Sequence, residues 1–179
     1  MSTAKFIDPD SSHHSRLLGA MATTQLVQRK GIFHGLPVHS DKIQGLNAVV
    51  TGANGISGYH MVRVLAESPQ RWKRIYCLSR RPPVVPGGLP DNAEFVPCDF
   101  LKGPREIAKV LADKNVQADY VFFYSYIQPP PKPGGGIWSD AEQMTSLNSA
   151  LLENFLNALG EAGIKPERIM LQTGAKNYG

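Results

Sequence analysis

The chain has 179 residues, of which 42% are hydrophobic, so it is long enough for one domain with a buried core. Its formal net charge is +4 and its pI is about 9.1. The basic residues are scattered apart from two short clusters, Arg71–Arg74 and Arg80–Arg81. A nucleic-acid-binding protein usually shows a denser basic stripe with interleaved aromatic residues, so the composition argues against that class.

Cysteine, histidine and apolar content exclude further classes. Cys77 and Cys98 do not form a CxxC pair, and the pair His13-His14 has no partners at metal-ligand spacing, so we expect no metal site. No apolar run approaches the about 20 residues of a membrane span. The first residues also lack the apolar stretch of a secretory signal. We therefore expect a reduced, cytoplasmic location and no membrane partner.

The chain divides into residues 1–45 and residues 46–179. Residues 1–20 are polar, and we expect a disordered tail there, with Met21 as a second plausible start. Residues 22–45 show no clear periodicity and are expected to form an irregular segment that packs along the domain.

Strand and helix patterns alternate from Leu46 onward, separated by proline- and glycine-rich loops at 82–90 and 128–136. The predicted strands span 46–50, 74–78, 93–96, 119–124 and 168–172. The predicted helices span 56–67, 105–113 and 140–159.

All three helices carry apolar residues at helical spacing, and the second takes them from Ile107, Val110 and Leu111. The first takes its apolar positions from Ile56, Met61, Val62 and Leu65. In the last, a stripe runs at helical spacing from Met144 to Leu159. Gly160 and Gly163 are expected to stop this helix.

Five strands separated by helices predict an α/β fold with a doubly wound parallel sheet. Right-handed crossovers then give the Rossmann strand order 3-2-1-4-5. Because the chain ends at Gly179, right after the fifth strand, we expect the fold to be truncated before a substrate domain.

Glycines at GxxGxxG spacing lie between the first strand and the first helix, in Thr51–Gly58. The first glycine allows a tight turn, the second lets the backbone approach a pyrophosphate, and the third lets helix and strand pack closely. The helix N-terminus then offers free N–H groups to phosphates. This context favours dinucleotide binding, and the alternative is a purely structural turn. The loop residues expected at the cofactor are Gly52, Asn54, Gly55, Ile56 and Gly58.

The end of the second strand indicates which dinucleotide is bound. An NAD-binding domain usually places an acid there for the ribose hydroxyls. This sequence has Ser79-Arg80-Arg81 instead, and a pair of guanidinium groups suits the 2′-phosphate of NADPH. The alternative is two solvated surface arginines.

The residues after the third strand, Cys98-Asp99-Phe100, are also expected near the cofactor. Asp99 is a candidate acceptor for the adenine amino group, and its alternative role is a loop or helix cap. We expect Phe100 beside it at the cofactor. Cys77 and Cys98 are interpreted as small buried residues rather than reactive thiols.

Taken together, these residues resemble the extended branch of the short-chain dehydrogenase/reductase superfamily, and more narrowly its progesterone 5β-reductase/iridoid synthase-like group. The resemblance covers about residues 46–179. Its matches are Thr51–Gly58, Ser79–Pro82, Val121–Ser125, Asn148 and Gln172–Gly179.

The resemblance implies hydride transfer from NADPH to an activated carbon–carbon double bond, commonly an enone, or to a carbonyl. The Tyr-x-x-x-Lys pair of the wider superfamily is absent. In the narrower group the lysine comes from TGxK, which makes Lys176 the candidate catalytic residue, and the tyrosine comes from further downstream. Lys176 would bind the nicotinamide ribose and lower a tyrosine pKa by its charge, and its alternative role is a surface lysine. Tyr178 is not assumed to be the proton donor, and Asn177 departs from the histidine of the group.

The same resemblance implies that the nicotinamide lies over the carboxyl ends of the fourth and fifth strands. Tyr124, Ser125, Thr173 and Gly174 are the residues expected there. The expected partner is then a small-molecule substrate. A homodimer is an open alternative for the full-length form. Two other interpretations stay open: a non-catalytic NADP-binding sensor, and an inactive truncated fragment.

Overall fold

The computed structural model describes residues 27–32, 34–35 and 40–174. The chain divides into two compact units, Met1–Ser40 and Asp41–Gly179. In the first unit, the described residues form turns and bends with one bridge residue, Val27. The predicted tail at 1–20 and Lys176 lie outside the described residues.

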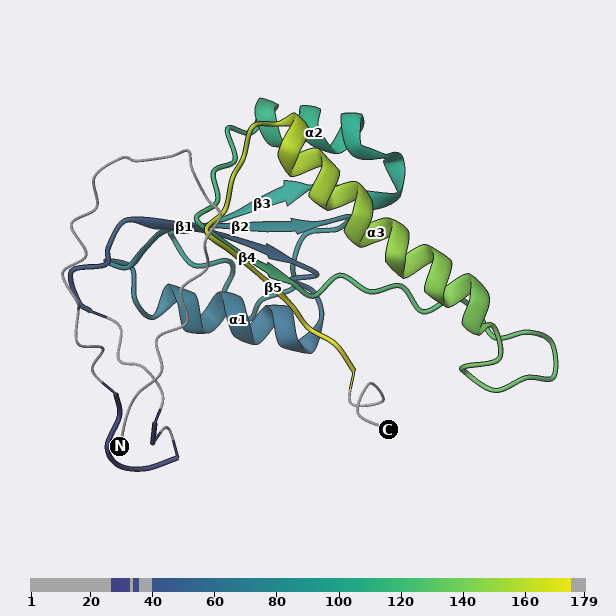
Figure 1. Ribbon diagram of the computed structural model, residues 1–179, viewed down its shortest axis with the longest axis horizontal. Helices are drawn as coiled ribbons and strands as arrows, with labels where there is room; N and C mark the ends of the chain where they lie inside the picture. Colours follow the sequence, from purple (N-terminus) through teal and green to yellow (C-terminus); the bar gives the residue numbers. More distant parts are fainter. Residues whose placement is uncertain (1–26, 33, 36–39, 175–179) are drawn as a thin grey trace, which may run out of the picture. The chain divides into compact units, whose positions relative to one another are not determined.

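The second unit is built on a five-stranded parallel sheet (Figure 1). Its strands are β1 (Leu46–Thr51), β2 (Trp72–Ser79), β3 (Ala93–Pro97), β4 (Tyr120–Phe123) and β5 (Arg168–Leu171). They pair in the order β3-β2-β1-β4-β5, which confirms the predicted doubly wound topology.

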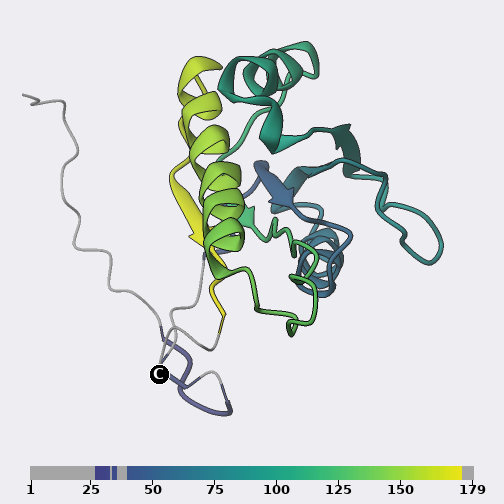
Figure 2. The same ribbon diagram turned by 90° about the vertical axis from the view of Figure 1, so that its right-hand side faces the viewer.

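The helices cover the two faces of this sheet unequally. Helix α1 (Ile56–Ala66) lies on one face, whereas α2 (Pro104–Asp113) and α3 (Ala141–Glu161) lie on the other (Figure 1). Figure 2 shows α3 running alongside α2, with which it packs. Among the helices in the described ranges, none combines the length and apolar character that crossing a membrane requires.

Each face buries its own apolar cluster, because alternate strand residues point to opposite sides. Toward α2 and α3, the core centres on Phe100, Phe123 and Phe155, whose ring centroids lie 5.1–6.1 Å apart. Toward α1, the core contains small side chains such as Ala48 and Cys77, which let the helix approach the sheet closely.

The structure corrects two details of the predicted helices. Ile56 was expected on the apolar face of α1 but is 80% exposed, because it stands in the first turn beside the exposed loop residues Asn54 and Gly55. Gly160 does not stop α3, which continues to Glu161. The chain turns at Gly163 instead, where φ is +69° and the Ile164 amide donates to the Leu159 carbonyl.

Candidate functional site

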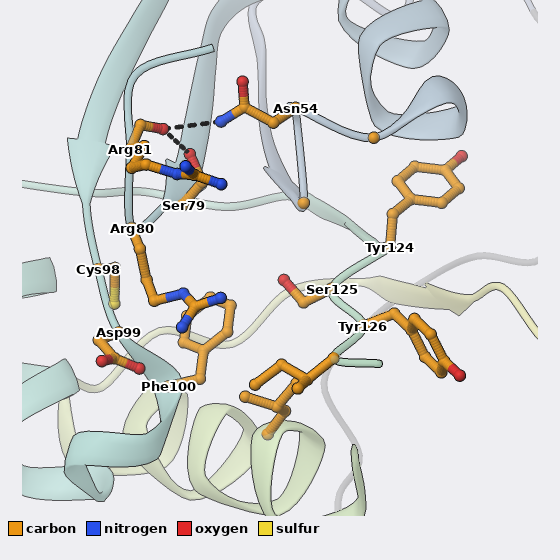
Figure 3. A pocket seen from close by; sticks show the side chains of 14 residues that line it. Asn54, Ser79, Arg80, Arg81, Cys98, Asp99, Phe100, Tyr124, Ser125 and Tyr126 are labelled. Atoms are coloured by element: carbon orange, nitrogen blue, oxygen red, sulfur yellow. Dashed lines mark hydrogen bonds between the residues drawn. The ribbon is translucent and has the colours of Figure 1, made fainter. Parts of the chain in front are cut away.

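A pocket of about 310 Å³ lies at the carboxyl edge of the sheet, where the strand order reverses between β1 and β4 (Figure 3). Open α/β sheets bind ligands at this kind of position. The pocket is lined by Gly52, Asn54, Gly55, Ser79, Arg80, Arg81, Cys98, Asp99, Phe100, Tyr124, Ser125, Tyr126, Ile127 and Leu151. Most of the predicted cofactor residues therefore meet in one hollow.

Close packing explains two of the three loop glycines. Gly52 has a φ of +65°, and a Cβ atom there would lie 2.7 Å from the Tyr124 carbonyl oxygen. A Cβ atom at Gly58 would collide with the Gly52 carbonyl oxygen. Gly58 is buried and does not line the pocket. It serves the loop by letting the first turn of α1 pack against Gly52.

The N-terminus of α1 opens into the same pocket. Gly55 is the N-cap and provides no side-chain hydrogen bond. The Tyr59 amide donates to the Gly55 carbonyl oxygen at 2.9 Å, so the helical ladder begins only there. The preceding amides of the first turn have no partner within the helix, and the helix dipole adds a partial positive charge. This edge of the pocket is chemically suited to an anion.

Thr51 joins the ends of β1 and β4. It is fully buried, and its hydroxyl oxygen accepts hydrogen bonds from the Tyr124 and Ser125 amides, each at 3.1 Å. The bonds hold the chain where it leaves β4, beside Gly52. Thr51 was not among the predicted site residues. Its position directly before the first loop glycine could have indicated a role at the site.

Two exposed arginines form the opposite wall of the pocket. Arg80 and Arg81 follow the last residue of β2, and no carboxylate stands at this strand end. Figure 3 shows the Arg80 side chain reaching into the pocket toward Ser125, while Arg81 lies beside Ser79. Within the described ranges, neither guanidinium group has a hydrogen-bond or ion-pair partner, so two uncompensated positive charges border this hollow.

The polar side chains of Asn54 and Asp99 make bonds within the protein. Asp99 Oδ1 accepts from the Leu101 amide at 3.1 Å and caps a short 3₁₀ helix, Phe100–Lys102. The capping alternative for Asp99 is therefore present, although the residue also lines the pocket. The Asn54 side chain bonds to the segment that follows β2, donating to the Arg81 carbonyl oxygen and accepting from the Val84 amide.

The sequence interpretation missed the wall formed by Tyr126, Ile127 and Leu151. Asn148 on α3 positions this wall, because its amide group accepts from the Ile127 amide and donates to the Ile127 carbonyl oxygen, both at 2.8 Å. Asn148 and Leu151 lie one turn apart on α3. The sequence analysis named Asn148 only as one of the matches to the reductase group. A polar residue on the apolar stripe of this helix was the available sign that the helix contacts the site.

Both cysteines are buried, as predicted. Burial raises the pKa of Cys77 to about 12. For Cys98 burial again raises the pKa to about 12, with the charge of Asp99 adding to the effect. Both thiols are therefore neutral near pH 7, which argues against a nucleophilic role for Cys98 at the pocket wall.

Several predicted residues lie elsewhere. Ile56 is exposed and does not line the pocket. Thr173 and Gly174 are exposed after β5 and do not line it either. Lys176 lies outside the described residues. The cofactor roles of all these residues stay predictions.

Comparison with known proteins places this geometry in a family. The chain is 29% identical over 133 residues to the short chain dehydrogenase gsfE of Penicillium aethiopicum, a match that covers 73% of this chain and 33% of that protein. It is 26% identical over 134 residues to the (S)-8-oxocitronellyl enol synthase of Catharanthus roseus, covering 73% of this chain and 30% of the enzyme. The chain thus spans about a third of the length of these curated relatives.

A solved structure and a family model agree with these matches. The crystal structure of a proposed epimerase from Burkholderia cenocepacia J2315 superposes with a TM-score of 0.55 at 20% identity, over 76% of this chain and 40% of that one, which supports the fold alone. The relatives confirm the resemblance to extended short-chain dehydrogenases with iridoid-synthase-like members. The model of the NAD dependent epimerase/dehydratase family matches residues 48–179, a range that includes the glycine loop and the whole pocket. The chain belongs to this family.

Proposed function

We propose that this chain is the cofactor-binding portion of an NADPH-dependent oxidoreductase that reduces an activated carbon–carbon double bond or a carbonyl group. The observation that carries the proposal is the pair of arginines at the end of β2, which have no ion-pair partner among the described residues and border a pocket that also contains the glycine loop. Family membership supports a nicotinamide dinucleotide as the cofactor. The names of the relatives, a short chain dehydrogenase and an enol synthase, support the reaction class.

The residues present fit such a cofactor. The uncapped N-terminus of α1 suits the diphosphate, and the absence of a Cβ atom at Gly52 and Gly55 leaves the loop backbone accessible at the pocket. Arg80 and Arg81 suit the 2′-phosphate, because a guanidinium group can donate two parallel hydrogen bonds to phosphate oxygens. The strand end offers no carboxylate that would repel this phosphate or accept from the two ribose hydroxyls of NADH.

The remaining pocket residues divide along the length of the cofactor. Asp99 and Phe100 would lie at the adenine end, while Tyr124 and Ser125 would lie toward the nicotinamide. Burial raises the pKa of Tyr124, so its phenol stays protonated near neutral pH.

When bound, NADPH supplies the hydride. The chain's own contribution to the chemistry is proposed to come from Lys176. Its ammonium group would hold the nicotinamide ribose and favour the ionised form of a neighbouring tyrosine, lowering that tyrosine's pKa.

Nucleotide titration of the purified 179-residue chain tests the proposal. We expect NADPH to bind at least about tenfold more tightly than NADH, because charge-assisted hydrogen bonds contribute about 1.5–3 kcal/mol each. The double variant Arg80→Ala/Arg81→Ala should lose this preference. Lys73→Ala/Arg74→Ala is the matched control, since it removes the same charge from the other end of β2 and should keep the preference. Equal affinity of the unaltered chain for NADPH and NADH would refute the NADPH assignment.

A further inference from the structure

The segment that carries the two arginines has no regular structure of its own. The chain leaves β2 at Ser79 and reaches β3 only at Ala93, without an intervening helix. Residues 80–82 are exposed, and the segment is rich in proline and glycine. Something other than a helix or a strand must therefore fix the backbone from which Arg80 and Arg81 project.

Asn54 supplies that fixation. Its Nδ2 donates to the Arg81 carbonyl oxygen at 2.8 Å, and its Oδ1 accepts from the Val84 amide at 3.0 Å. The Ser79 hydroxyl donates to the same Arg81 carbonyl oxygen at 2.7 Å. We call these three bonds the Asn54 clamp. Figure 3 shows Asn54 and Ser79 converging on this one oxygen.

The clamp joins two positively polarised regions. Asn54 belongs to the glycine loop, directly before the Gly55 N-cap of α1, whereas Arg81 belongs to the segment after β2. The bonds cross 27 and 30 residues of sequence, so they fix the position of the arginines relative to the helix N-terminus. A dinucleotide with a 2′-phosphate presents anions to both regions at once, and pre-positioned groups bind at a lower entropic cost.

We propose that Asn54 is a positioning residue that sets the preference for NADPH over NADH by holding the Arg80–Arg81 backbone. This inference rests on the proposed function. Both side-chain ends of Asn54 are engaged within the protein, so the residue acts through the arginines rather than by a side-chain contact to the nucleotide. The diphosphate is common to NADPH and NADH, and only the 2′-phosphate depends on the arginines. Loss of the clamp therefore affects NADPH selectively.

The clamp itself is testable without nucleotide. In Asn54→Ala, the Val84 amide loses its acceptor, and its hydrogen exchange measured by NMR should accelerate about fivefold or more, because local opening governs such exchange. Amides in the β1–β2 ladder serve as the internal reference and should keep their rates. An unchanged Val84 rate alongside an unchanged ladder would overturn the clamp.

The consequence for selectivity is tested by titrating NADPH and NADH separately. In Asn54→Ala, the Kd for NADPH should rise about five- to tenfold, the range expected for one or two lost hydrogen bonds, while the Kd for NADH changes less than about twofold. Val84→Ala is the matched control, because the residue is 87% exposed and its backbone amide keeps the bond to Asn54. In an Arg80→Ala/Arg81→Ala background, Asn54→Ala should have no further effect on NADPH affinity. Equal weakening of both nucleotides, or a full effect in that background, would overturn the inference.

Two further outcomes separate this inference from the proposed function. An unaltered chain that prefers NADPH, together with an Asn54→Ala variant of unchanged preference, overturns the clamp and leaves the function intact. An unaltered chain that binds neither nucleotide, or both equally, overturns both. Where Asn54→Ala fails to fold by circular dichroism, Ser79→Ala removes one of the two donors to the Arg81 carbonyl oxygen and should lower the preference in the same direction by a smaller factor.

Discussion

The carboxyl edge of the sheet has two halves that differ in how completely they are enclosed. At the β1–β2 end, Val50 and Leu78 are fully buried, and the adjoining Gly52 leaves no room for a methyl group. At the β4–β5 end, β5 has a strand partner on one side only, and Ile169 and Leu171 are 41% and 46% exposed. The first half is thus held by close contacts among described residues, whereas the second half borders open surface.

This difference in enclosure matches the two parts of the proposed cofactor site, the dinucleotide half and the nicotinamide end. The dinucleotide half contains the glycine loop, the arginines and the Asn54 clamp, and all of them have their supporting contacts in the described chain. The nicotinamide end has Tyr124 and Ser125 held by Thr51, but Thr173 and Gly174 after β5 lie away from the pocket. We therefore expect substitutions in the first half to cost far more stability than substitutions at the β5 edge.

The largest effect is expected for Gly52→Ala. The new methyl group would meet the Tyr124 carbonyl oxygen at 2.7 Å, and an L-residue at a φ of +65° adds backbone strain of about 1–3 kcal/mol. The free energy of unfolding should fall by about 3 kcal/mol or more, with loss of nucleotide binding, as measured by urea denaturation and NADPH fluorescence. Gly136→Ala is the control, because a Cβ atom there has open space and its φ is not left-handed. A Gly52→Ala variant as stable as the control would contradict the close packing of this half.

A smaller but substantial effect is expected for Thr51→Val. Valine keeps the shape of threonine but removes the oxygen that accepts from the Tyr124 and Ser125 amides. Leaving part-buried amides without an acceptor should lower the free energy of unfolding by about 2 kcal/mol. Thr51→Ser keeps the hydroxyl and should recover most of the loss. A Thr51→Val variant as stable as the unaltered chain, beside a destabilised Thr51→Ser variant, would show that the methyl group, rather than the oxygen, stabilises this junction.

Local patterns were sufficient to predict the framework. Short apolar runs bounded by glycine and proline predicted all five strands, and the handedness of the crossovers then left one strand order. The three loop glycines were recognised because their spacing reflects a local requirement of the turn. The predicted strand ends lie within two residues of the observed ends. The largest difference is at β2, which was predicted over 74–78 and spans Trp72–Ser79.

Contacts between distant segments were not predictable in this way. The two Asn54 bonds of the clamp and the two Thr51 bonds join residues that are 27 to 74 positions apart, and no periodicity predicts them. The wall at Ile127 likewise depends on Asn148 across 21 positions. The end of α3 was misplaced for a different reason: a glycine inside a helix is tolerated at a cost of about 1 kcal/mol, so the turn at Gly163, rather than Gly160, ended the helix.

The smallest effect is expected at the β5 edge, where two neighbouring positions give a direct contrast. Ile169 pairs in register with Val121 on β4, so both side chains point to the same face of the sheet. Val121 is 1% exposed, and Val121→Thr should cost about 2 kcal/mol because it buries a hydroxyl group in an apolar cluster. Ile169→Thr places the same hydroxyl at a 41% exposed position and should change the free energy of unfolding by no more than about 0.5 kcal/mol. Urea denaturation of both variants measures the contrast. Comparable losses at the two positions would mean that the β5 edge is covered in solution, and a dependence of that loss on protein concentration would identify a second copy of the chain as the cover.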